Sequence, residues 1–138
     1  MLPDADVVGF RLGVHYADFL GHRGFSHSLV FAAILALSLV VLPTAGAHRR
    51  ALWMYLFLAT ASHGLLDALT DGGLGVALLA PFDNSRYFFP ARPIAVSPIG
   101  LSHFFSAGGM SVIASEAVWV WLPSVLLAMA GLAFRKSR

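Results

Sequence analysis

The chain has 138 residues, of which 58% are hydrophobic and only 12% are charged, and its mean hydropathy is +0.77. An ordinary soluble domain carries about 25% charged residues, so this composition argues against a soluble globular enzyme, a disordered chain and a direct nucleic-acid binder. Nine basic and seven acidic residues leave a net charge of +2 without a basic patch, and the absence of cysteine excludes disulfides and thiolate metal sites, so any metal must be held by His, Asp or Glu.

The first 28 residues form a polar segment that holds several candidate metal ligands. The segment lacks a basic start followed by an apolar run, so it is not a signal peptide. Asp4 and Asp6, in the string LPDAD, would supply carboxylate oxygens from an extended segment. Either one of them binds a given ion, or each binds one of two ions. The alternative is an ordinary solvated Asp pair after a Pro turn.

Three apolar runs predict membrane-spanning helices. They cover Leu29 to Ala47, Ala51 to Leu66 with a helical continuation to about Thr70, and Ala117 to Phe134. Each approaches the roughly 20 residues that a spanning helix needs. A buried core helix of a soluble protein is the alternative for each run. Three such runs in so short a chain favour an all-α, multi-pass transmembrane helical bundle.

A long linker separates the second and third of these helices. Residues 72–115 are apolar but are interrupted by Pro and Gly, which is typical of an interfacial or re-entrant segment packed over helix ends. We expect the aromatic side chains at positions 87–89 to anchor in the membrane interface. Arg86 and Arg92 would read a substrate headgroup or, as we prefer, snorkel or pair with Asp83 or Glu116.

The ionisable residues are segregated along the chain. Basic residues join the first two helices at Arg49 and Arg50 and follow the third helix at positions 135–138, which predicts that these ends are cytoplasmic. All the acids and five of the six histidines fall on the opposite side. Ionisable groups near a membrane are costly and need a partner, a metal or a water-filled cavity. We therefore expect a site on the non-cytoplasmic face.

The end of the second helix carries a stripe of candidate ligands. His63, Asp67 and Asp71 are spaced four residues apart, so in a helix that continues to about residue 70 they project from one face. A neutral imidazole beside one or two carboxylates is a ligand set for a cation such as Zn²⁺. The alternative is a His–Asp hydrogen bond with a second Asp at the membrane boundary.

Two further histidines precede the first helix. His22 and His27 flank a glycine-containing turn, and Ser26 or Ser28 could cap the helix that follows. Because the first two helices are expected to be antiparallel neighbours, His27 can face the stripe on the second helix. Histidines that simply lie in a polar interfacial loop are the alternative. The total of His and Asp exceeds one tetrahedral zinc site and suits two metals, or one metal with a general base and orienting groups.

These strings resemble a known family. LPDAD, GHRGFSHSLVFA and SHGLLDALTDGG, together with PFDNSRYFFPARPI and VSPIGLSHFFS, resemble the bacterial membrane-bound metal-dependent hydrolase family, also described as LexA-binding inner-membrane-associated hydrolases (YdjM-like). The resemblance covers essentially the whole chain and implies a multi-helix inner-membrane hydrolase. Family members usually begin with a hydrophobic helical hairpin, which this single domain of residues 1–138 would lack. A fainter likeness to zinc-dependent phospholipase C and P1-type nucleases would imply phosphoester hydrolysis.

The residues and the resemblance together predict hydrolysis by metal-activated water. We expect one or two divalent ions, most simply Zn²⁺, and six side chains to hold them: Asp4, Asp6, His22, His27, His63 and Asp67. Asp71 would be a further ligand or the general base. Arg23 would pair with a substrate phosphate or anchor its loop to headgroups or an acid. Glu116 and His103 are weaker candidates for the site.

The expected partners are the lipid bilayer, a lipid or lipid-linked substrate and, because three helices are few for enclosing a cavity, a second copy of the chain. Two other functions remain open. A metal or proton transporter would use membrane-embedded His and Asp, but it should carry polar groups through the full depth of the membrane. A non-catalytic interaction protein would hold a structural metal, which a closed four-ligand site would favour over an open one.

Overall fold

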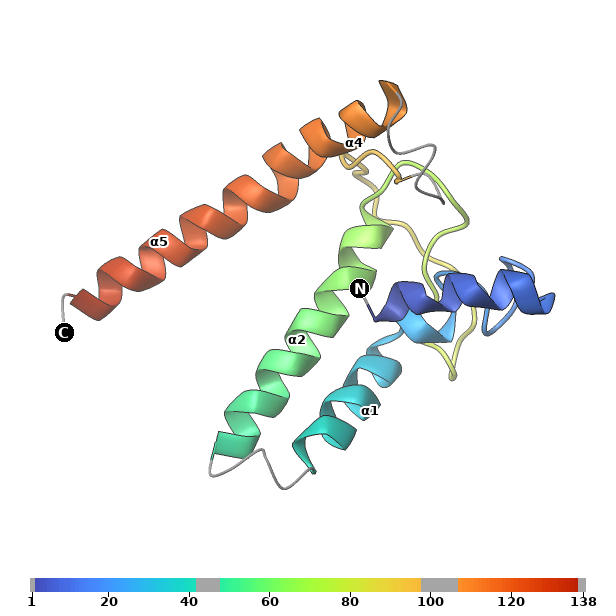
Figure 1. Ribbon diagram of the computed structural model, residues 1–138, viewed down its shortest axis with the longest axis horizontal. Coiled ribbons are helices and arrows are strands. Elements are labelled where there is room, and N and C mark those ends of the chain that lie inside the picture. Colours follow the sequence, from blue (N-terminus) through green and yellow to red (C-terminus); the bar gives the residue numbers. More distant parts are fainter. Residues whose placement is uncertain (1, 42–47, 98–106, 137–138) are drawn as a thin grey trace. The chain divides into compact units, whose positions relative to one another are not determined.

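The computed structural model describes residues 2–41, 48–97 and 107–136. Within these ranges the chain is helical and has no β-strand, only isolated bridges between Thr70 and Ile94 and between Val76 and Tyr87. The all-α class is thereby confirmed. Figure 1 labels the α-helices, and the elements in chain order are η1 (Pro3–Leu12), η2 (Phe25–His27), α1 (Leu29–Val40), α2 (Arg49–Ala68), α4 (Ala107–Glu116), the π-helical turn η4 (Ala117–Trp121) and α5 (Leu122–Lys136).

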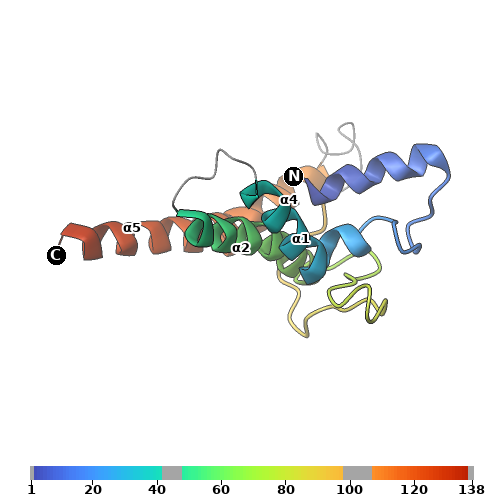
Figure 2. The ribbon, with the colours of Figure 1, turned by 90° about the horizontal axis from the view of Figure 1, so that it is seen from below.

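The chain divides into two compact units, which are described separately. The first contains residues 1–69 and 73–90, and the second contains residues 70–72 and 91–138. In the first unit α1 and α2 pack against each other as neighbours, and both Figure 1 and the turned view of Figure 2 show them side by side. This pair positions the candidate site at the end where α1 begins and α2 ends.

A capping serine begins helix α1, and small side chains pack this helix against α2. Ser28 accepts a hydrogen bond from the Phe31 N–H at 3.0 Å, so of the two expected capping serines it is Ser28 that caps the helix. Ala32, Ala36 and Val40 recur every four residues and are buried. Small side chains on one stripe let α2 approach closely, and the other face of α1 stays exposed.

Residues 3–12 of the polar N-terminal segment form a 3₁₀-helix, whereas the sequence suggested an extended segment around Asp4 and Asp6. Pro3 at the first turn of η1 has no N–H to satisfy, and Gly13, with φ of 84°, ends the helix in the left-handed region. At about three residues per turn, a step of two residues turns the chain by roughly 240°. Asp4 and Asp6 therefore leave η1 in different directions.

The loop that follows α2 packs over the ends of the two helices. The Leu29 N–H at the start of α1 donates to the Leu78 carbonyl, and the Ala77 N–H donates to the Arg23 carbonyl. Val76 is fully buried in this loop. For residues 73–90 the expected packing of the apolar linker over helix ends is thus confirmed, whereas its contact with a membrane interface stays a prediction.

The long helix of the second unit begins ten residues earlier than the sequence pattern indicated. It runs from Ala107 through η4 and α5 to Lys136, so the predicted linker of residues 72–115 is too long at its C-terminal end. Pro123 consequently lies inside the helix, where it cannot donate to the carbonyl four residues earlier. The π-helical turn η4 directly precedes it, and Ser124 Oγ donates to the Val120 carbonyl at 2.6 Å.

By length and hydropathy, the described residues contain one helix that could cross a membrane. It covers Gly108–Lys136, and an 18-residue stretch within it has a mean hydropathy of 2.0. Helix α1 has 12 residues, and positions 42–47 of the predicted first span lie outside the described residues. His63 and Asp67 lower the hydropathy of α2. Three spanning helices therefore remain a prediction.

Candidate metal centre

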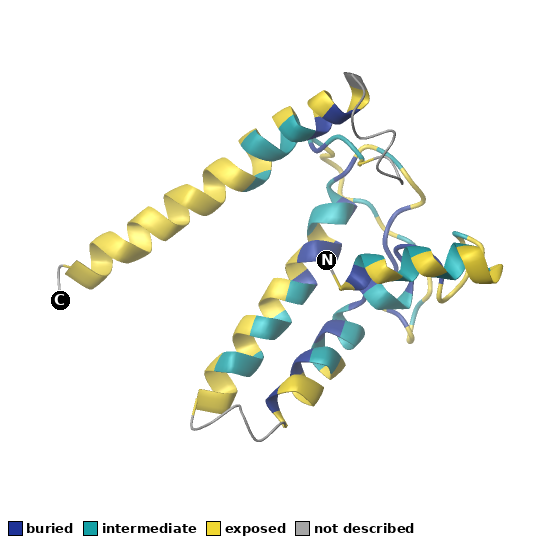
Figure 3. Cartoon of the chain, in the orientation of Figure 1, coloured by how far each residue is buried: buried dark blue, intermediate teal, exposed yellow. Residues whose placement is uncertain are grey.

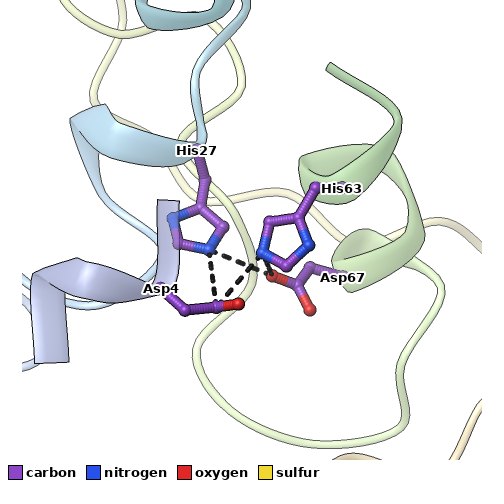
Figure 4. A group of neighbouring side chains, drawn as sticks. All are labelled: Asp4, His27, His63 and Asp67. Carbon is purple, nitrogen blue, oxygen red and sulfur yellow. Dashed lines mark hydrogen bonds and ion pairs between the residues drawn. The ribbon is translucent and has the colours of Figure 1, made fainter. Parts of the chain in front are cut away.

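Four side chains from three segments converge in the first unit. Asp4 comes from η1, His27 from η2, and His63 and Asp67 from the last turns of α2 (Figure 4). Nε2 of His27 lies 3.5 Å from Asp4 Oδ1 and 3.2 Å from Asp67 Oδ2. Nε2 of His63 lies 3.1 Å and 3.7 Å from the same two oxygens. We call these four residues the first group.

The spacing and chemistry of the first group fit a zinc-like ion. Metal–ligand bonds of about 2.0–2.1 Å in a tetrahedral site put neighbouring donor atoms about 3.3–3.4 Å apart, and the four donor separations scatter around this value. His27 Nε2 is buried and makes no hydrogen bond within the described structure. A buried nitrogen directed at two carboxylates is what a cation site requires.

A second group lies on the other side of the His27 ring. Its members are Asp6, His22 and His27, whose donor atoms also gather closely. His22 Nδ1 donates to Asp6 Oδ1 at 2.7 Å, and Ser26 Oγ donates to Asp6 Oδ2 at 2.5 Å. His27 Nδ1 lies 3.2 Å from Asp6 Oδ2 and 3.0 Å from Ser26 Oγ. The Asp6 side chain is only 6% exposed.

The carboxylates and imidazoles shift one another's pKa values. Burial would raise the pKa of Asp4 and Asp6, but their contacts with the neighbouring histidines outweigh it and hold both pKa values well below their usual range. Burial would lower the pKa of His27, yet contacts with Asp4, Asp6 and Asp67 raise that pKa to about 10. In the metal-free site His27 is therefore a positively charged imidazolium at neutral pH. Its charge takes the place that a metal cation would otherwise occupy.

Arg23 contacts a member of the first group. Its side chain is 5% exposed, and Nη2 donates to Asp67 Oδ1 at 3.1 Å, which leaves Asp67 Oδ2 directed at the histidines. Arg23 also has φ of 61°, the left-handed region that costs free energy for a residue with a Cβ atom. Of the two expected roles, the structure places Arg23 on an acid, which orients that carboxylate.

Gly64 allows η2 to reach α2. A Cβ atom at this position would overlap the carbonyl oxygen of His27, which is backbone and cannot move aside. The glycine follows His63 directly in the sequence, so the close approach brings His27 beside His63. Sequence reasoning missed Gly64, although a glycine inside an apolar helix next to a histidine is a signal that could have identified it.

Arg86 holds the loop that carries His22 and Arg23. Its Nη1 donates to the His22 carbonyl at 2.9 Å, and its Nη2 donates to the carbonyls of Tyr16 at 2.9 Å and Asp18 at 3.2 Å. The structure thus gives Arg86 backbone carbonyls as partners instead of the expected acid, whereas a contact with lipid headgroups stays a prediction. A planar guanidinium can bind several carbonyls at once, which the sequence pattern did not indicate.

The two other candidates within the described residues, Asp71 and Glu116, belong to neither group. Helix α2 ends at Ala68, so Asp71 leaves the helical stripe, and its exposed carboxylate accepts a hydrogen bond from the Val96 N–H at 2.8 Å within the second unit. Glu116, the last residue of α4, is half-buried and belongs to neither group. His103 lies outside the described residues. A role for Asp71 as ligand or base stays a prediction.

Comparisons with known proteins identify the family. The model of the family described as "YdjM inner membrane protein" matches residues 1–137. The "Inner membrane protein YbcI" of Escherichia coli (strain K12) is 47% identical over 131 residues, which cover 92% of this chain and 75% of that protein. No solved structure matches the chain. The chain therefore belongs to the YdjM inner membrane protein family, which confirms the resemblance found in its sequence.

Proposed function

We propose that this YdjM-family protein is a membrane-bound hydrolase that holds a divalent metal, most simply Zn²⁺, at the first group. The observation that carries the proposal is the convergence of two imidazole nitrogens and two carboxylate oxygens at separations of 3.1–3.7 Å. Mixed nitrogen and oxygen donors in this arrangement suit zinc better than calcium or magnesium, which prefer oxygen ligands alone.

The surrounding residues suit a hydrolytic site that opens on one side. A cation held there would supply Lewis-acid activation of a water molecule. The Asp4 side chain is 38% exposed, whereas those of His27, His63 and Asp67 are at most 17% exposed, so substrate would approach past Asp4. Arg23 keeps Asp67 aligned for its role as ligand. The assignment of Asp71 as general base, and that of Arg23 to a substrate phosphate, rest on the sequence alone.

The family supports an inner-membrane location, with residues 108–136 as a spanning helix. We propose that the site lies on the non-cytoplasmic face, because the densest basic clusters of the sequence lie away from the candidate ligands. A site beside the membrane would act on an ester or phosphoester of a lipid or lipid-linked substrate. Phosphoester hydrolysis is the chemistry that the fainter likeness to zinc phospholipases favours.

The first test is metal content together with hydrolysis. The protein, purified in detergent micelles, should contain zinc and hydrolyse a chromogenic phosphate or carboxylate ester, and His63→Ala and Asp67→Ala should lose both properties. The matched control is His15→Ala, which removes a histidine whose side chain is 87% exposed and belongs to neither group. Equal zinc content in all four proteins would rule out the proposed ligands.

A structural metal is the second candidate function, because four protein donors can close a tetrahedral site. It would leave zinc bound and the fold stabilised, but without hydrolysis that depends on zinc. The transporter alternative has less support. In the described residues, the basic, acidic and histidine side chains of α1 and α2 lie only in the first turn and the last turns of α2, at Arg49 and Arg50 and at His63 and Asp67.

A further inference from the structure

The two groups of candidate ligands share a single imidazole ring. Nε2 of His27 faces Asp4 and Asp67 of the first group, and Nδ1 of the same ring faces Asp6 and Ser26 of the second. The ring therefore stands between the two groups with one nitrogen directed at each. How many ions the protein holds depends on what each nitrogen can do.

A neutral imidazole offers one lone pair and one N–H group. A metal ion takes the lone pair, and the other nitrogen keeps its proton and donates it to an acceptor. His27 can therefore serve as a ligand in one group only. Without His27, the second group retains only Asp6 and His22, which are too few donors for a closed zinc site.

The distances within the second group are those of hydrogen bonds. Both Asp6 oxygens are engaged, at 2.7 Å from His22 Nδ1 and 2.5 Å from Ser26 Oγ, which is closer than the roughly 3.3 Å between neighbouring donors around a zinc ion. An ionised carboxylate can only accept hydrogen bonds, so the Ser26 hydroxyl must donate its single hydrogen to Asp6. Ser26 Oγ can then only accept a proton from His27 Nδ1, 3.0 Å away.

We propose that the protein binds one metal ion, in the first group, and that Asp6 is a positioning residue rather than a ligand. Asp6 and Ser26 hold the proton of His27 on Nδ1, which directs the Nε2 lone pair at the metal. His22 fixes the second Asp6 oxygen and so keeps the carboxylate in place. The inference rests on the proposed function, because it assumes that the first group holds a metal.

Zinc stoichiometry of the full chain in detergent micelles tests the inference. The wild-type protein, saturated with Zn²⁺ and freed of excess, should hold one zinc per chain, and His63→Ala should hold none. Asp6→Asn should still hold one zinc at saturation but bind it about 10- to 100-fold more weakly, as loss of a hydrogen-bond partner of a ligand typically does. His22→Ala should weaken binding less, because it leaves Asp6 in place.

The protonation state of His27 gives a readout that general destabilisation would not produce. In nitrogen-15 NMR spectra of the zinc-loaded protein with labelled histidine, His27 should show a protonated Nδ1 and a metal-bound Nε2. Ser26→Ala and Asp6→Asn should each shift the Nδ1 signal while the Nε2 signal stays that of a metal ligand. If Asp6→Asn does not fold, Ser26→Ala alone provides this measurement.

Two results would overturn the inference, and a third would overturn the proposed function on which it rests. Two zinc ions in the wild type and one in Asp6→Asn would make Asp6 a ligand of a second ion. A folded Asp6→Asn protein without zinc at saturation would make Asp6 a ligand of the only ion. A wild-type protein that never binds zinc would instead contradict the proposed function itself, so the two failures are distinguishable.

Discussion

The site end of the α1–α2 pair and helix α5 are both helical, but they are built in opposite ways. At the site end, Ser28, His27 and Ala68 are 1–3% exposed. Ser26 donates to Asp6, Arg23 donates to Asp67, and Gly64 closely approaches the His27 carbonyl. Every residue of α5 is exposed, and Figure 3 shows this helix in the exposed colour along its whole length. The first region depends on the identity of each residue, whereas the second depends on its overall hydropathy.

The difference predicts where a substitution is tolerated. In α5 the backbone hydrogen bonds are satisfied within the helix and the apolar exterior suits lipid, so one apolar residue can replace another. At the site end, contacts join residues far apart in the sequence. One added methyl group or one lost hydrogen bond therefore displaces several neighbouring residues. Paired substitutions, one in each region, test this contrast.

The largest effect on folding stability and zinc affinity together is expected from adding one methyl group at Gly64. Gly64→Ala should push η2 away from α2, because the new Cβ atom would overlap the His27 carbonyl, and should cost about 1–3 kcal/mol of stability or more. Zinc affinity should fall with it, since His27 would move from His63. Thermal unfolding and zinc titration in micelles measure both effects.

The matched control is Gly131→Ala in α5, where nothing lies within 4 Å of the added Cβ atom. Alanine favours a helix over glycine by about 0.5–1 kcal/mol, so this variant should unfold at the same or a slightly higher temperature. If Gly64→Ala and Gly131→Ala change the unfolding temperature by the same amount, the close approach at Gly64 is contradicted.

A charge in α5 tests the second region, where we expect overall hydropathy to decide membrane insertion. Leu126→Arg would place a cation in the candidate span, at a cost of about 2.5–3.5 kcal/mol for insertion. A reporter fused after residue 138 should show a smaller fraction of chains with an inserted helix. Leu20→Arg, at a similarly exposed leucine in the loop before η2, should leave that fraction unchanged. A reporter signal that Leu126→Arg leaves unchanged would contradict the assignment of α5 as a membrane-spanning helix.

The smallest of these effects should come from Arg86. Arg86→Lys keeps the charge but cannot bind three carbonyls with one planar group, so it should lower the unfolding free energy by about 1–2 kcal/mol. Its unfolding temperature should fall relative to Arg11→Lys, which changes an exposed arginine at the end of η1. No difference between the two variants would refute the role of Arg86 in holding the loop.

Much of the fold could be read from the sequence because helices leave local signals. The Ser28 cap and the apolar run located the start of α1, and the predicted second helix overlaps nearly all of α2. The third helix was placed too late, because the Gly and Ser residues before Glu116 resemble a linker. In the structure these residues form α4, where Val112 is buried and Ser115 Oγ accepts a hydrogen bond from the Ala95 N–H.

The candidate site was predictable where its members repeat at helical spacing or flank a helix start. His63 and Asp67 share a helix face, and the antiparallel pairing of α1 and α2 brought in His27. Different directions for Asp4 and Asp6 follow from the sequence if the segment is extended, but the 3₁₀-helix that sets them could not be predicted, because this segment has no apolar periodicity. The contacts of Gly64 and Arg86 join residues whose proximity only the folded backbone creates.

The origin of the first group in three segments has a consequence for chain entropy. Asp4 and His63 are 59 residues apart in the sequence, yet they meet at 3.1 Å. An ion bound to both would close this long loop as a cross-link, and in the chain-entropy model a covalent link over such a loop stabilises a fold by about 4 kcal/mol. In a chain without cysteine, the metal would thus serve as the staple that a secreted protein of this size obtains from a disulfide.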